Sequence, residues 1–331
     1  MDTAQFLEKY QAGERNFQGI HLRGAELSYV DLIGSNLENS DLEDANLTFA
    51  YLNGVNLNRA NLVKAKLCGA NLNKASLNGA KLRDADLHGA ILQGVDLRYS
   101  DLALSILLDT NLIQADLRGV NLQGADLRGA SLRGANMRYE RRLYEGANLR
   151  GADLRGTDLR GVNLTGADLT RANLSRANLS EAVLRGASLY QANLNSANLQ
   201  SAFLTEANLT EARFIGANLK KVKLERAVLA QAQLLRVELC DAMMNDAKLA
   251  NANLAYADLS RVNLVRADLS RTDLSYANLT QSDLTDASLA RTNLRNANLS
   301  YTYLTRVELS SATTIGARLR GAVMPNGEIH E

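Results

Sequence analysis

The fold of this chain is decided by the stretch at residues 147–176, which reads ANLRG ADLRG TDLRG VNLTG ADLTR ANLSR. Leucine recurs at every fifth position, with a small residue two positions before it and Asn or Asp directly before it. This period fits neither an α-helix, which repeats about every 3.6 residues, nor a strand, which repeats about every 2. It fits a chain that turns by about 90° in each unit, so that four units close a square coil of roughly 20 residues.

The same period runs through most of the sequence in two phases. It extends from Phe17 to Met137 and resumes from Leu149 to Leu309. We expect the central residue and the small residue two before it to point inward, because larger side chains would overfill a narrow coil. Most glycines lie two positions after a centre, where a turn or a close approach requires them. The remaining corners are expected to use a turn geometry that is open to other residues.

Composition excludes several classes of protein. Leu and Ala supply 60 and 47 of the 331 residues, and there is no Trp. The 37 Lys and Arg residues nearly balance the 36 Asp and Glu residues. This balance disfavours a polybasic nucleic-acid binder and an acidic mimic of nucleic acid. Neither a signal peptide nor an apolar run long enough to span a membrane is present, so the sequence predicts a cytoplasmic protein with no membrane partner.

The sequence contains no motif that indicates an enzyme. Cys68 and Cys240 form no disulfide framework, and the three histidines are too dispersed for a metal cluster. The many Asp residues occupy the position before Leu that the repeat favours. No nucleophile or phosphate motif stands out from the repeat, and a filled coil lacks a concave pocket. We therefore predict no catalytic residues, no cofactor, no metal and no small-molecule substrate.

The pattern A(D/N)LXX resembles the pentapeptide repeat family. It appears as Ala-Asp-Leu-Arg-Gly at 125–129 and 152–156, and as Ala-Asn-Leu-Ser-Arg at 172–176. The resemblance implies an all-β fold, a right-handed quadrilateral parallel β-helix whose coils stack through backbone hydrogen bonds. With this repeat length the chain supplies about 15 coils of one continuous solenoid.

Both ends of the chain depart from the repeat and are expected to form caps. Thr3 is predicted to cap a short helix with Phe6, Leu7 and Tyr10 on its apolar side, and Ile329 is predicted to fold back after a turn. The interruption between the two runs adds two residues to the period. The predicted segments are, in chain order, an N-terminal helical cap at 1–14, a first repeat run at 15–137, an irregular insert at 138–146, a second repeat run at 147–310 and a C-terminal cap at 311–331.

Only departures from the repeat can indicate a partner, because most residues are committed to the coil. The insert either packs inward as a bulge or projects as a recognition element. Two groups of apolar residues occupy outward positions, and such groups are found both at interfaces and as ordinary surface residues. The candidate partner-binding residues are Arg138, Tyr139, Arg141, Arg142 and Tyr144 in the insert, Val183, Phe203 and Met243 beside Lys223, and Leu104, Ile106 and Leu108.

Charged residues also recur on the predicted outer surface. Residues spaced by 20 should form a column of alternating charge, which stabilises the register or keeps the surface soluble. Residues 118–185 are rich in Arg, which indicates either an anionic partner or a solvated surface. The residues of the alternating column are Glu206, Arg226, Asp246, Arg266, Asp286 and Arg306.

The ends of the chain are similar to those of a cyanobacterial family member that controls heterocyst differentiation. The strings that carry this similarity are GERNFQ at 13–18 and GAVMPNGEIHE at 321–331. The sequence is therefore interpreted as a non-enzymatic protein-interaction scaffold or regulator whose protein partners are unidentified. The alternative is a DNA-mimicking, gyrase-binding protein of the quinolone-resistance type. The near-zero net charge disfavours that alternative and makes nucleic acid an unlikely partner.

Overall fold

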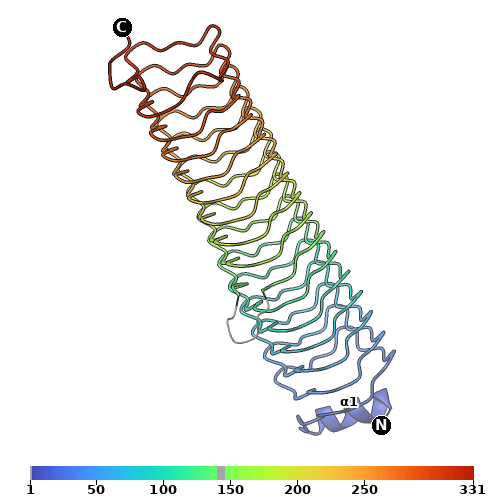
Figure 1. Ribbon diagram of the computed structural model, residues 1–331. Coiled ribbons are helices and arrows are strands. Elements are labelled where there is room, and N and C mark those ends of the chain that lie inside the picture. The colour runs from blue at the N-terminus through green and yellow to red at the C-terminus, as the bar shows by residue number, and fades with distance from the viewer. Residues whose placement is uncertain (1, 140–145) are drawn as a thin grey trace. The chain divides into compact units, whose positions relative to one another are not determined.

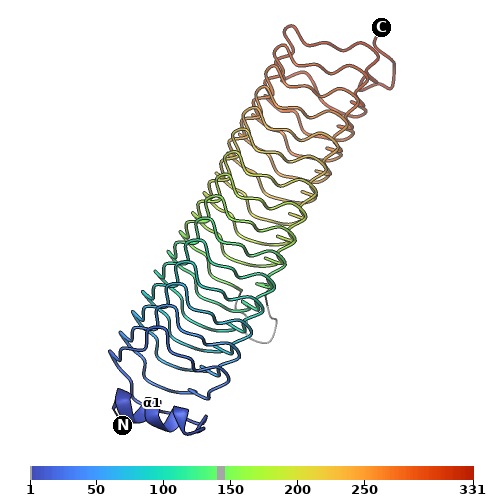
Figure 2. The same cartoon turned by 180° about the vertical axis from the view of Figure 1, so that it is seen from behind.

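The computed structural model describes residues 2–139 and 146–331. The chain forms two compact units, Met1–Asp168 and Leu169–Glu331. Figures 1 and 2 show that each unit is a stack of coils. The described residues contain one helix, α1 (Thr3–Gln11), and the sheet ladders are built from single-residue parallel bridges. The all-β prediction with one N-terminal helix is therefore confirmed.

Neighbouring coils are joined by backbone hydrogen bonds at a register of 20 residues. In the pentad 40–44 of the first unit, Asp41 forms a parallel bridge with Asn61. The amide of Leu42 donates to the carbonyl of Asn61 at 2.7 Å, and the amide of Asp44 donates to Val63 at 3.0 Å. Repeated along each unit, this pattern makes a parallel β-helix.

The amide of Asp41 donates to the carbonyl of Ile20 on the preceding coil at 2.9 Å, and the other amides of the pentad are satisfied within the same coil. The amide of Ala45 donates to the carbonyl of Leu42 at 3.0 Å and closes the turn. The amide of Glu43 donates to the Oδ1 atom of Asp41 at 3.2 Å. Asn and Asp side chains are short enough to accept from the backbone two residues further on. This bond explains why the repeat prefers Asn or Asp directly before Leu.

The corners differ from the sequence expectation. We predicted a second turn geometry at corners without glycine, but the non-glycine corner residues also adopt the left-handed conformation, with φ between 53° and 63°. Arg, Asp, Tyr and Glu are all found there. This conformation costs L-residues about 1–2 kcal/mol each. The coil imposes it because the corner amide must reach the carbonyl of the next coil.

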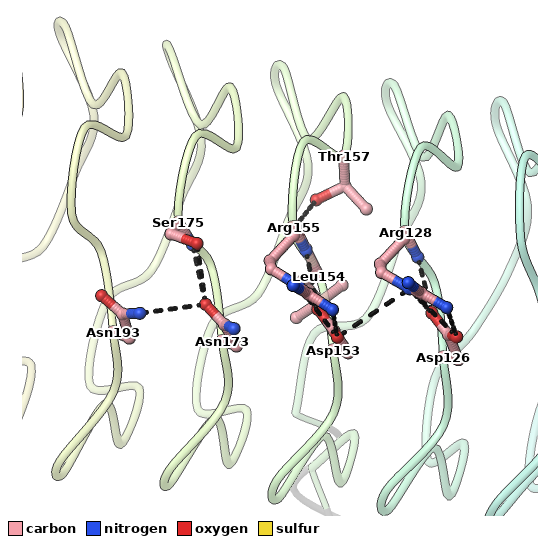
Figure 3. A network of polar contacts seen from close by, with 9 residues as sticks. All are labelled: Asp126, Arg128, Asp153, Leu154, Arg155, Thr157, Asn173, Ser175 and Asn193. Atoms are coloured by element: carbon pink, nitrogen blue, oxygen red, sulfur yellow. Dashed lines mark hydrogen bonds and ion pairs between the residues drawn. The ribbon is translucent and has the colours of Figure 1, made fainter.

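The core of each unit consists of the leucine columns and the small residues beside them. Leu42 and Ala45 in the first unit and Leu234 and Ala232 in the second are fully buried. The prediction that these two positions point inward is therefore confirmed. Where the small residue is Ser or Thr, its hydroxyl usually finds a carbonyl. Figure 3 shows Thr157, whose Oγ1 atom donates to the carbonyl of Leu154 at 2.6 Å.

The interruption between the two repeat runs is longer than the sequence predicted. Across it the register is 27 instead of 20, because Asn121 pairs with Asn148 and Asn136 pairs with Asn163. One coil of the first unit therefore carries seven extra residues. The predicted shift of two residues relative to the period is confirmed, since seven is one five-residue unit plus two. The sequence counted that additional unit as a face of the coil, whereas Asn136 and Asn148 lie on consecutive faces.

Helix α1 covers the first coil, but its cap is not the predicted one. Asp2 is the N-cap, and its side chain accepts from the amide of Gln5 at 2.8 Å in a capping box. Thr3 is instead the first residue of the helix. Phe6 is buried and packs edge-to-face on Phe17, with ring centroids 4.7 Å apart. This contact shields the open end of the core.

The C-terminal residues fold back as predicted. Val323 and Ile329 form an antiparallel bridge, and the amide of His330 donates to Ala322 at 2.8 Å. The turn between them contains Gly327, whose φ is 90°. The side chain of Ile329 nevertheless remains exposed. No helix within the described ranges has the length and apolar character that crossing a membrane requires.

Candidate interaction surfaces

The first apolar patch, defined as Leu104, Ile106 and Leu108, lies along one coil of the first unit. Leu104 is 49% exposed and Ile106 is 40% exposed, whereas Leu108 is half-buried. Leu104 occupies a corner with φ of 60° and is the only aliphatic residue with positive φ among the described residues. A leucine at this corner thus combines a backbone cost with an exposed apolar side chain.

On the neighbouring coils, a glycine lies beside Leu104 and two aspartates lie beside Ile106. Gly124 on the next coil makes room for Leu104, because a Cβ atom there would lie 2.9 Å from the Cδ2 atom of Leu104. Ile106 bridges to Asp86 on one side and to Asp126 on the other. The patch is therefore an apolar strip set between two carboxylates.

The apolar ladder, defined as Val183, Phe203, Lys223 and Met243, lies in the second unit. Parallel bridges join each of these residues to the next, which confirms the predicted register. Phe203 is 37% exposed and Met243 is 40% exposed. The ammonium of Lys223 lies 4.8 Å from the centroid of the Phe203 ring, within cation–π distance.

The insert is described only at its margins. The amide of Tyr139 donates to the carbonyl of Thr165 at 2.7 Å, and its side chain lies against Gly166. Arg138 is exposed, and its amide donates to the Oδ1 atom of Asn136 at 3.3 Å. The other candidates in the insert, Arg141, Arg142 and Tyr144, lie outside the described residues.

The arginine-rich part of the first unit is largely neutralised by its own carboxylates. In Figure 3, Arg128 makes a bidentate contact with Asp126, at 2.8 and 2.6 Å, and Arg155 makes the same contact with Asp153, at 2.9 and 2.7 Å. The hydrogen bond from Arg128 lowers the pKa of Asp126 below its ordinary value. This pairing favours the solvated-surface interpretation over an anionic partner at these residues.

The second unit uses hydrogen bonds between coils on its outer surface. Figure 3 shows one case, in which Asn193 donates to the Oδ1 atom of Asn173 at 3.1 Å and the Ser175 hydroxyl donates to the same atom at 2.9 Å. The alternating charge column is present as ion pairs between neighbouring coils. The three pairs are Arg226 with Glu206 at 2.5 Å, Arg266 with Asp246 at 2.7 Å and Arg306 with Asp286 at 2.5 Å.

These pairs lead to a prediction about pH. The hydrogen bond from Arg266 lowers the pKa of Asp246 in the folded protein below its ordinary value. Asp246 therefore stabilises the fold above its unfolded pKa, about 3.9, and this stabilisation is lost as the pH falls through the folded pKa. We expect the carboxyl carbon signal of Asp246 to titrate at lower pH in the parent than in Arg266→Gln. Equal midpoints would show that the ion pair does not form in solution.

Two aromatic stacks were missed in the sequence. Tyr256 and Tyr276 stack with centroids 4.9 Å apart and planes 2° apart, and Tyr29 and Phe49 stack at 5.4 Å. A spacing of 20 between aromatic residues would have revealed both. In residues 2–139 and 146–331, no group of three or more His, Cys, Asp or Glu side chains can hold a metal ion.

The family model described as Pentapeptide repeats (8 copies) matches this chain between residues 14 and 98, 105 and 138, 147 and 286, and 287 and 324. No curated protein matches the chain.

Several solved structures are similar to the chain. One is HetL, a pentapeptide repeat protein involved in heterocyst differentiation regulation from the cyanobacterium Nostoc sp. strain PCC 7120, with 29% identity over 100% of both chains and a TM-score of 0.26. Another is a trypsin-treated form of QnrB1, a plasmid-mediated fluoroquinolone resistance protein, with 18% identity, 73% of this chain and 88% of that chain covered, and a TM-score of 0.29. A thylakoid-lumen pentapeptide repeat protein of Arabidopsis thaliana is 33% identical over 33% of this chain and 69% of that chain, with a TM-score of 0.21.

Proposed function

This chain belongs to the pentapeptide repeat family, and from that membership we propose that it is a non-enzymatic scaffold or regulator that acts by binding other proteins. The family has a right-handed β-helix fold. Our proposal includes the finer geometry that the sequence predicts, namely four-sided coils about 15 in number. It also includes a cytoplasmic location and, through the similarity of the chain ends, a role like that of HetL in heterocyst differentiation.

The first apolar patch is the observation that carries this proposal. Most outward positions hold polar or charged residues that satisfy the backbone or pair between coils. Leu104 does neither, since its side chain is exposed and its backbone is left-handed. Asn, Asp or Gly at that corner would cost less. A partner that covers Leu104 and Ile106 gives a physical reason for keeping them, because burying exposed apolar area is favourable.

Substitution at this patch tests the proposal. We expect the double variant Leu104→Asn with Ile106→Ser to retain the parent's stability within about 1 kcal/mol, because Asn is tolerated in the left-handed region. Affinity capture from the native cell should recover at least about tenfold less of the principal partner, which corresponds to about 1.4 kcal/mol of binding free energy. Unfolding curves and quantitative mass spectrometry supply the two readouts.

Gln114→Asn is a matched control, because Gln114 is also a left-handed corner residue of the first unit, with φ of 58°. This variant should capture partners as the parent does. If removal of the first apolar patch, and then of Phe203 and Met243, left every captured protein bound, the interaction surfaces would be wrongly assigned. Potent inhibition or protection of DNA gyrase in a supercoiling assay would instead favour the DNA-mimic alternative.

A further inference from the structure

Two arginines of the second unit lie side by side at one corner. Arg271 and Arg291 are 20 residues apart and both adopt the left-handed corner conformation, with φ of 58° and 59°. They therefore occupy neighbouring coils, about 4.8 Å apart along the ladder. Both side chains are exposed. Two like charges opposite each other destabilise a ladder, so the fold alone gives no reason for this pair.

The pair differs from the four corner arginines of the same unit that form ion pairs. Each of these four binds a carboxylate on a neighbouring coil at 2.5–2.7 Å, and they are Arg226, Arg261, Arg266 and Arg306. Within the described part of the chain, neither Arg271 nor Arg291 has a carboxylate within 4.0 Å or a hydrogen bond from its guanidinium group. All five N–H donors of each guanidinium are thus available to a ligand.

Arg271 and Arg291 line a shallow groove. Its other lining residues are Ala250, Asn251, Ser270 and Ala290, all of which have short side chains, and the two arginines are exposed. Two carboxylates lie nearby in sequence, but neither lines the groove, and the Oδ1 atom of each accepts a backbone hydrogen bond. Asp268 accepts from the amide of Ser270 at 3.0 Å, and Asp273 accepts from the amide of Ser275 at 2.9 Å. The lining of the groove therefore contains two guanidinium groups and no carboxylate.

We propose that Arg271 and Arg291 together bind a phosphoryl group in this groove. A phosphoryl group carries a charge of about −1.5 to −2 at neutral pH and presents three oxygens. It can accept a bidentate contact from each planar guanidinium and can neutralise both charges. A single carboxylate would neutralise only one of them. The ligand is either free phosphate or a phosphorylated side chain of a partner, and both present the same chemistry.

Fluorescence anisotropy with the full-length protein and a labelled phosphoserine peptide tests this site. The double variant Arg271→Gln with Arg291→Gln should bind the peptide at least about tenfold more weakly than the parent. Gln is accommodated at such corners, as Gln231 and Gln281 show. The charge-matched control is Arg226→Gln with Arg266→Gln, which removes two positive charges from ion pairs. It should change the dissociation constant by less than about twofold.

Competition experiments distinguish free phosphate from a phosphorylated partner, and a peptide with Glu in place of phosphoserine tests for unspecific binding of anions. Inorganic phosphate that displaces the peptide at a similar concentration would identify free phosphate as a ligand, whereas a phosphopeptide that is displaced only by unlabelled phosphopeptide would identify a modified partner. Either result supports the site. The proposal is overturned if the parent does not bind the phosphopeptide, if a peptide with Glu in place of phosphoserine binds equally well, or if the control loses as much affinity as the double variant.

Discussion

Leu234→Ala will lower the free energy of unfolding by about 2–5 kcal/mol, whereas Leu235→Ala, at the adjacent position, will lower it by less than about 1 kcal/mol. Leu234 is fully buried at the centre of a pentad, and Leu235 is half-buried on the outer surface. Truncation at 234 removes buried apolar contacts and leaves a cavity that the stacked coils cannot close. Truncation at 235 removes contacts only with the surface.

Denaturant unfolding of the two variants measures this difference directly. The pair controls for residue type, because the same side chain is truncated at consecutive positions of one coil. Similar losses of stability at 234 and 235 would contradict the assignment of inward and outward positions. The difference between the two variants is more informative than either absolute value, because the unfolded chain is common to both.

Gly146→Ala will destabilise the first unit more than Gly151→Ala does. A Cβ atom at Gly146 would lie 2.5 Å from the carbonyl oxygen of Gly166 and 3.2 Å from its carbon, and these are backbone atoms of the adjacent coil. They cannot move without disturbing the ladder, so overpacking should cost about 1–3 kcal/mol or more. At Gly151 a Cβ atom would meet nothing within 4 Å, and φ is 64°.

Comparison with Gly151→Ala therefore isolates the effect of the close contact between residue 146 and the backbone of Gly166. The only cost of Gly151→Ala is that of the left-handed backbone, about 1 kcal/mol. Gly146 is not among the residues with positive φ, so its substitution pays only for the contact. Thermal unfolding of both variants should place the midpoint of Gly146→Ala lower. A lower midpoint for Gly151→Ala would mean that backbone strain, and not the contact with Gly166, decides the cost.

The repeat predicted the core and the register well because both follow from spacing alone. Leu234 could be assigned to the interior, and Arg266 could be placed beside Asp246, from a period of five and a coil of 20 residues. Spacing carries no information on backbone dihedral angles. The left-handed conformation of residues such as Arg271 therefore went unpredicted, because hydrogen bonds between coils override the intrinsic preference of arginine.

The errors at the insert and the omissions on the surface have separate causes. The seven extra residues before Leu149 become visible only when Asn121 is known to pair with Asn148. The close approach at Gly146 depends on an atom of another coil, so it has no sequence signal. The pair Arg271 and Arg291 did have a sequence signal, a spacing of 20 between like charges.

Site-specific photocrosslinking at Leu108 tests most directly the claim that the first apolar patch binds a protein. A photoreactive residue at 108 is compared with one at Thr48, which has the same position in its pentad and lies three coils away in the same unit. In the native cell we expect one discrete crosslinked protein at 108 and none at 48. Identical crosslinking at the two positions, or none at 108, would contradict the proposed function of the patch.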